Sequence, residues 1–193
     1  MEILAYLLPL LPQQLGDRNF MKDHGVGLPY MCGAMANGIA SERLVIAMGE
    51  AGLLGSFGAA GLVPSRIEEA IQTIQTSLPE GPYAFNLIHS PAEDAIERAA
   101  AELFLKHQVK TVEASAFLDL TPHIVDYRVN GLSQGPGGQV MIGNRVIAKI
   151  SRSEVAEKFM RPPPERVLAK LVQENRITET QARLASRVPM ADD

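Results

Sequence analysis

Short apolar runs alternate with amphipathic stretches along most of the chain. Each run is too short for a buried helix, and small or polar residues that suit the start of a helix follow it closely. Alternation of this kind is typical of parallel strands whose connecting helices cover the sheet. The pattern therefore predicts five strands, at residues 28–32, 53–59, 83–88, 110–116 and 145–150.

The stretches after these runs carry signals for helix starts. Ser41 is a candidate N-cap for a helix over 42–51, and Gly52 is a candidate C-cap. Three later starts have a Ser followed three residues on by a Glu, which is the pattern of a capping box. We expect these boxes at Ser65, Ser90 and Ser151, and a further helix after Thr121-Pro122.

Two segments break the alternation. Residues 125–146 are rich in Gly and Asn, so a β-ribbon or a loose excursion is expected there rather than a helix. From Pro162 onward no strand pattern is present. A helix from Glu165 to about residue 174, a turn, and a capping box at 178–181 that starts a second helix to about residue 187 predict a helical hairpin.

The chain thus divides into three parts. Residues 1–27 form a lead-in whose leucines, Leu4, Leu7, Leu8 and Leu11, have helical spacing and are expected to cap apolar surface elsewhere. Residues 28–160 hold the five βα units, and residues 161–193 hold the helical hairpin. The strand centres lie about 30 residues apart, and a closed (β/α)₈ barrel needs about 240 residues at that spacing. The fold class predicted is α/β, either an open sheet or part of a TIM-type barrel.

Composition narrows the class of protein. The chain has 193 residues, of which 46% are apolar, and Lys+Arg 18 against Asp+Glu 22 gives a net charge of −4. These values exclude intrinsic disorder and argue against a nucleic-acid partner. The single cysteine, Cys32, cannot form an internal disulfide or a Cys-rich metal site. No apolar run reaches the ~18 residues of a membrane span, so we expect a cytoplasmic protein without a membrane partner.

Small residues follow the first two strands, at 33–38 and 55–61. They suit either tight strand-to-helix turns or the close approach of a backbone to a flat ligand. Asn86, near the end of the third strand, either caps the next helix or hydrogen-bonds a heterocyclic ligand. Both alternatives stay open for each feature.

Glu113 and Ser115 lie on one face of the fourth strand, because side chains alternate with a period of two. A carboxylate inside a strand is costly unless it is paired or belongs to a site. Lys149, at the end of the fifth strand, either pairs with Glu113 or stabilises anionic charge on a cofactor. Because strand ends of parallel sheets hold ligands, we favour a site.

The remaining candidates give weaker signals. The four histidines lack metal-ligand spacing, and His89 either faces a ligand at a strand end or caps a helix. Cys32 suits a small buried residue better than a nucleophile. No Ser/His/Asp arrangement is recognisable, so the sequence assigns no catalytic residue.

Four segments together resemble one family: 30–41 (YMCGAMANGIAS), 54–61 (LGSFGAAG), 85–90 (FNLIHS) and 144–151 (NRVIAKIS). They are similar to the PfaD branch of the nitronate monooxygenase-like flavoproteins. The resemblance implies an FMN-dependent (β/α)₈ barrel that acts in trans as an enoyl reductase for polyketide or polyunsaturated fatty acid synthases. It covers nearly the whole chain.

The resemblance also implies roles for residues. The backbone of Gly33, Ala34, Met35 and Ala36 would line the flavin, Asn86 would hydrogen-bond it, and Glu113 and Lys149 would face the same pocket. The implied chemistry is hydride transfer from NAD(P)H to FMN and on to the β-carbon of an enoyl thioester carried by an acyl carrier protein, with a proton going to the α-carbon.

Family members continue beyond the segment that resembles residues 189–193, with a sixth strand, a Gly-Gly-His turn and phosphate-binding loops. The resemblance therefore implies that this chain is the N-terminal part of such an enzyme, that a companion chain could complete the barrel, and that FMN binding by this chain alone is weak. Two alternatives remain: nitronate oxidation, or a non-catalytic interaction fragment of a synthase complex, docked through the helical hairpin.

Overall fold

The five predicted strands form one parallel sheet in sequential order. The computed structural model describes residues 5–193, so Leu4 of the predicted lead-in lies outside the described residues. The sheet order is β1-β2-β3-β4-β7, and every neighbouring pair is parallel. The strands are β1 (Met31–Cys32), β2 (Leu54–Phe57), β3 (Ala84–Ile88), β4 (Thr111–Ser115) and β7 (Arg145–Lys149). The prediction of five parallel βα units is confirmed.

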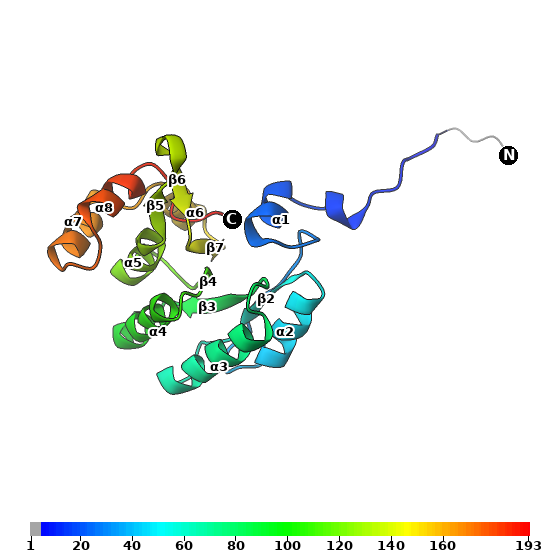
Figure 1. Cartoon of the computed structure of the whole chain (residues 1–193), viewed down its shortest axis with the longest axis horizontal. Helices are drawn as coiled ribbons and strands as arrows, with labels where there is room; N and C mark the ends of the chain where they lie inside the picture. Colours follow the sequence, from blue (N-terminus) through cyan, green and yellow to red (C-terminus); the bar gives the residue numbers. More distant parts are fainter. Residues whose placement is uncertain (1–4) are drawn as a thin grey trace.

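A helix follows each strand and packs on the outer face of the curved sheet (Figure 1). Side chains such as Phe57, Phe85 and Val112 point into this helix layer and form the main core. Leu54 and Ala84 point to the concave inner face. The sheet with its outer helices is thus an arc of a barrel. The helices are α2 (Glu42–Glu50), α3 (Pro64–Ser77), α4 (Asp94–Lys106), α5 (Pro122–Asn130) and α6 (Ser153–Phe159).

Some predicted helix caps form and others do not. Ser41 Oγ accepts the Leu44 N–H at 3.4 Å, and the Thr178 capping box is complete. The boxes predicted at Ser65, Ser90 and Ser151 are wrong, since the N-caps of α3, α4 and α6 are Val63, Glu93 and Arg152.

Local competition explains each difference in capping. Pro64 starts α3 one residue before Ser65, because proline suits the first helical position. The Ser90 hydroxyl faces the Glu93 side chain at 3.4 Å instead of a helical N–H. Glu154 pairs with the Arg152 guanidinium at 2.9 Å, so its carboxylate is not available to close a box.

The segment from 125 to 146 combines a helix with a ribbon. α5 extends to Asn130, so the expectation of no helix is wrong for residues 125–130. The ribbon is present: β5 (Leu132–Gln134) and β6 (Val140–Ile142) pair antiparallel. The helix expected after Thr121-Pro122 is thus present, but its extent past residue 125 was missed, because α5 is buried on nearly all sides, including Asp126 and Arg128, and so has no polar face.

Buried ion pairs compensate the charges on α5. Arg128 is 1% exposed and binds the Asp192 carboxylate through both terminal nitrogens, at 2.6 and 2.9 Å. Asp126 binds Arg176, which lies between the hairpin helices α7 (Glu165–Gln173) and α8 (Glu179–Ala185). Burial raises the pKa of the Asp126 carboxyl, and the Arg176 guanidinium opposes that shift. The predicted C-terminal helical hairpin is present and packs on α5 through α7 and α8.

The N-terminal segment leaves the body of the molecule as an arm (Figure 1). Leu7 and Leu8 are 89% and 82% exposed, so these leucines cover no apolar surface of this chain. Packing begins at α1 (Arg18–His24), where Phe20 and Met21 contact the apolar cluster on the inner face of the sheet. Among the described residues, no helix is long and apolar enough to cross a membrane.

The last two residues lie along the outer edge of β7. Asp192 N–H donates to the Val146 carbonyl at 2.9 Å, and Ala148 N–H donates to the Asp193 carbonyl at 2.8 Å. The Asp192 side chain also accepts the Val146 N–H at 2.9 Å. These contacts hydrogen-bond the C-terminal residues to the edge strand of the sheet.

Candidate functional site

Polar side chains gather on the concave face towards the carboxyl ends of the strands. Asn86 on β3 lies in register with Glu113 on β4, and Ser115 on β4 lies in register with Lys149 on β7. All four point inward, because their neighbours along the strands pack against the helices. The sequence prediction that Asn86, Glu113 and Lys149 converge is thus met by the geometry.

Glu113 is enclosed and is bound on both oxygens. It is 1% exposed, and Oε2 accepts the Ala34 N–H at 2.8 Å. Oε1 lies 2.6 Å from Lys149 Nζ, an ion pair whose distance is short but whose angle is poor for a hydrogen bond. The Lys149 side chain is 56% exposed. The lysine side chain therefore lies on the open side of the cluster while the carboxylate stays covered.

Asn86 is held by the neighbouring strand. Its Nδ2 donates to the Glu113 carbonyl at 3.0 Å and to Ser115 Oγ at 2.9 Å. This arrangement excludes the alternative that Asn86 caps the helix near Ser90. Its Oδ1 receives no hydrogen bond from the described residues and is not fully enclosed, so it remains an acceptor for a ligand donor.

The two glycine-rich segments interlock beside these side chains. Asn37 N–H donates to the Ala60 carbonyl at 2.8 Å, and Gly38 N–H donates to the Gly58 carbonyl at 2.9 Å. A Cβ on Gly58 would lie 1.6 Å from the Met35 carbonyl oxygen, so only glycine allows this approach. The loop that contains Gly33, Ala34, Met35 and Ala36 is therefore fixed as one rim of the site.

His89 and Cys32 do not join the site. His89 Nδ1 lies 2.7 Å from Glu97 Oε2, and its ring stacks on Phe117 with centroids 5.4 Å apart. Glu97 also accepts the Thr121 hydroxyl, so this carboxylate joins His89 and the start of α4 to the start of α5. The Cys32 sulfur lies 4.0 Å from the Gly33 carbonyl oxygen. Within residues 5–193, no group of three or more His, Cys, Asp or Glu side chains could hold a metal ion.

Ser56 is a candidate that the sequence reasoning did not single out. It is 1% exposed, points to the concave face beside Gly33, and its Oγ has no partner among the described residues. Its position two residues after Leu54 on the inner face is the signal that could have identified it.

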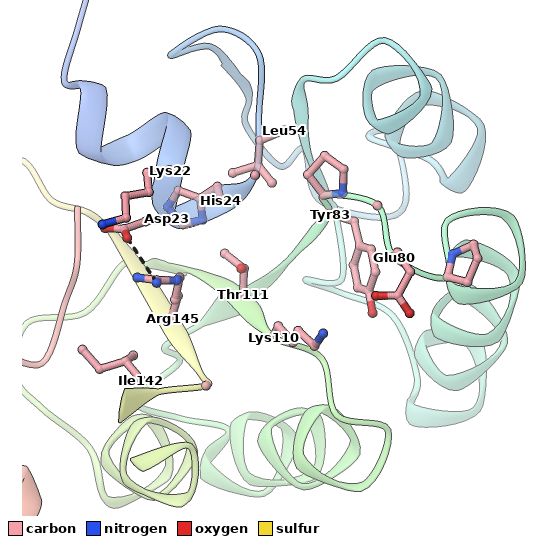
Figure 2. Close-up of a pocket in the computed structure, with 15 residues that line it drawn as sticks. Lys22, Asp23, His24, Leu54, Glu80, Tyr83, Lys110, Thr111, Ile142 and Arg145 are labelled. Atoms are coloured by element: carbon pink, nitrogen blue, oxygen red, sulfur yellow. Dashed lines mark ion pairs between the residues drawn. The ribbon is translucent and has the colours of Figure 1, made fainter. Parts of the chain in front are cut away.

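A pocket of about 500 Å³ lies at the opposite, amino ends of the strands (Figure 2). Residues of α1 face β4 and β7 across it, and Asp23 pairs with Arg145 at 3.2 Å. His24, also from α1, binds Asp193 at 2.9 Å. Cations and carboxylates are mixed here, so these ion pairs fasten α1 to the sheet and do not define a ligand of one charge.

Fold and geometry together define an α/β barrel arc with a cluster of polar side chains at the carboxyl ends of its strands. No family model matches the chain. It is 55% identical over 179 residues to a polyunsaturated fatty acid synthase protein of Thraustochytrium sp., and 44% identical over 182 residues to the polyketide biosynthesis protein PksE of Bacillus subtilis. These matches cover 93% and 94% of this chain, but 12% and 24% of the relatives.

Solved structures give the same picture. The enoyl reductase domain of MlnA, from the macrolactin cluster of Bacillus amyloliquefaciens, superposes with a TM-score of 0.89 at 39% identity. The match covers 93% of this chain and 41% of that domain. FabK from Thermotoga maritima, at 20% identity and a TM-score of 0.54, supports the fold alone. The resemblance predicted from the sequence is confirmed: the chain is similar to part of a PfaD-type enoyl reductase.

Proposed function

We propose that this chain forms part of an FMN-dependent enoyl reductase that acts on enoyl thioesters carried by an acyl carrier protein. The observation that carries the proposal is the match to the MlnA enoyl reductase domain over 93% of this chain. Relatives that belong to a polyunsaturated fatty acid synthase support a synthase complex as the setting.

The residues at the carboxyl ends fit a flavin. The polar edge of an isoalloxazine ring has carbonyl and ring-nitrogen acceptors and an N–H donor, and the Lys149 ammonium and Asn86 Oδ1 supply the complementary groups. The small residues at 33–36 let the backbone approach a flat ring. Ser56 Oγ, which is buried and unpartnered among the described residues, marks a further polar position on the same face.

When bound, FMN would supply the hydride chemistry between NAD(P)H and the β-carbon of the enoyl thioester. The protein groups would position and stabilise. Lys149 would place positive charge where negative charge develops, and this stabilisation needs no reorganisation because Glu113 already holds the ammonium. The interlocked loops at 33–38 and 58–61 would keep water from one side of the site.

A companion segment that adds strands beyond β7 would complete the barrel. The test is to express this chain together with the complementary part of the MlnA enoyl reductase domain and to assay the purified complex. We expect bound FMN and NAD(P)H-dependent reduction of an acyl-carrier-protein enoyl thioester. Flavin-dependent oxidation of a nitronate without nicotinamide would favour the monooxygenase alternative. A complex without flavin would favour an interaction fragment.

A further inference from the structure

Glu113 makes a contact that spans the arc of the sheet. In the sheet order, β1 and β4 are separated by β2 and β3. The Glu113 carboxylate nevertheless accepts the N–H of Ala34, which follows β1, at 2.8 Å. The sheet therefore curves far enough for a side chain of β4 to reach the loop after β1 across the concave face.

The same carboxylate is closed to a ligand. It is 1% exposed, with Ala34 on one oxygen and Lys149 Nζ 2.6 Å from the other. A buried carboxylate without these partners would be strongly unfavourable. A ligand on the concave face would meet the half-exposed Lys149 and the loop backbone before it met Glu113.

The loop from Gly33 to Gly38 is fastened at two places. Its far end is held by backbone hydrogen bonds from Asn37 and Gly38 to the segment after β2. Its near end, at Ala34, is held by the hydrogen bond that the Ala34 N–H donates to Glu113, which is its only acceptor among the described residues. Loss of the Glu113 carboxylate therefore frees the near end while the far end stays in place.

We propose that Glu113 is a positioning residue of the cofactor site: it fixes the Ala34 amide and the Lys149 ammonium and does not itself contact the cofactor. The assignment rests on the proposed flavin function and changes the role that the sequence resemblance implied for Glu113. Lys149 becomes the contact residue, and Glu113 acts through Lys149 and the loop.

The test compares Glu113→Gln, Glu113→Ala and Lys149→Met in the ¹⁵N-labelled 193-residue chain. Amide hydrogen exchange reports the hold on Ala34, and an FMN titration followed by amide chemical shifts reports affinity. Glutamine keeps an acceptor for the Ala34 N–H, whereas alanine removes it. We expect Ala34 exchange at least ~10-fold faster in Glu113→Ala, because a hydrogen bond to a charged group is lost, and within ~3-fold of the parent in Glu113→Gln.

The hydrogen-exchange rate of the Asn37 amide should stay unchanged in all three variants, because its hydrogen bond to the Ala60 carbonyl is independent of Glu113. FMN binding should weaken about 10-fold or more in Glu113→Ala and in Lys149→Met. Glu113→Gln should weaken it by less than alanine does, because its single amide oxygen holds the Ala34 N–H while its NH2 group no longer pairs with Lys149. Lys149→Met should leave Ala34 exchange unchanged. Loss of FMN affinity with unchanged Ala34 exchange identifies Lys149 as a contact residue. Loss of FMN affinity together with faster Ala34 exchange identifies Glu113 as a positioning residue.

Two results would overturn the proposal. One is unchanged Ala34 exchange in Glu113→Ala. The other is FMN binding at parental affinity in Glu113→Ala, since the cofactor site would then not depend on the groups that Glu113 fixes. If the parent chain and its complex with the remaining strands both leave FMN unbound, the proposed function fails, and Ala34 exchange still decides whether Glu113 holds the loop.

Discussion

Gly58 and Asn86 show how closely single residues are constrained at the carboxyl ends of the strands. The missing side chain of Gly58 leaves space that the Met35 carbonyl occupies. Both N–H groups of the Asn86 amide donate hydrogen bonds to β4. At both positions the surroundings suit the residue that is present better than a chemically similar one. Substitutions at these positions therefore test the site one atom group at a time.

Gly58→Ala should destabilise the chain. The added Cβ would lie 1.6 Å from the Met35 carbonyl oxygen, so one of the two loops must move. We expect a loss of about 2–3 kcal/mol in the free energy of unfolding, measured by urea denaturation, because strained overpacking costs that much. Gly27→Ala is the matched control: its Cβ would meet the Gly52 carbonyl oxygen at an ordinary 3.7 Å, and its loss should stay below ~1 kcal/mol. Equal losses would contradict the clash.

Asn86→Ala should weaken FMN binding in the complex that contains the remaining strands. The change removes the Oδ1 acceptor and leaves Ser115 Oγ and the Glu113 carbonyl without their donor. We expect binding roughly 2- to 10-fold weaker, measured by quenching of flavin fluorescence, for the loss of one hydrogen bond with a net contribution of about 0.5–1.5 kcal/mol. Binding at parental affinity would remove Asn86 from the site.

Individual residues also show where sequence reasoning reached its limit at the site. Asn86, Glu113 and Lys149 could be predicted, because polar residues inside apolar strands are rare enough to stand out. The link from Glu113 to Ala34 could not, because it joins positions 79 residues apart and depends on the curvature of the sheet. Ser56 was missed because its segment, rich in small residues, was interpreted as a turn, whereas Ser56 lies on β2.

At the scale of elements, the strands were easier to predict than the helix starts and the extent of α5. The strands follow from apolar runs, whereas a helix start depends on competition between nearby partners, as at Ser90 and Ser151. α5 carries Asp126 and Arg128 on buried positions, so its pattern reads as polar and irregular. The partners that compensate these charges, Arg176 and Asp192, lie 50 and 64 residues away in the sequence.

Asp126→Asn should change the pH dependence of stability. Burial raises the pKa of Asp126 in the folded state above its ordinary value. A raised carboxyl pKa contributes stability that is present at acid pH and is lost as the pH rises through the folded-state pKa. The free energy of unfolding of Asp126→Asn minus that of the parent chain should therefore be more positive at pH 6.5 than at pH 3.5. Urea unfolding of both proteins at both pH values measures this difference. The opposite slope would show that Arg176 outweighs burial.

At the scale of the whole molecule, the five strands form an arc and not a closed barrel. The concave face that carries Asn86, Ser115 and Lys149 is therefore open to water on one side. Electrostatic interactions are weaker in water than in an enclosed site, because the effective dielectric constant is higher. Asn86, Glu113 and Lys149 are brought together within this chain, but one side of the face that they line is not enclosed.

The 193-residue chain alone should bind FMN weakly and should show no enoyl reduction. If the missing enclosure removes two charge-assisted hydrogen bonds of about 1.5–3 kcal/mol each, affinity falls roughly 10²- to 10⁴-fold. Isothermal titration of FMN into the chain, and into its complex with the remaining strands, measures the difference. Stoichiometric FMN and full turnover by the chain alone would contradict the need for a closed barrel.

The Arg128–Asp192 ion pair also determines when α5 can pack fully during synthesis of the chain. A ribosome releases the chain from its amino end, so Arg128 of α5 emerges 64 residues before Asp192. Until then the guanidinium that α5 buries has no carboxylate, and its desolvation opposes the docking of α5 on the sheet. The arc can therefore reach its final packing only after the chain has passed the helical hairpin, when Asp192 reaches both Arg128 and the edge of β7.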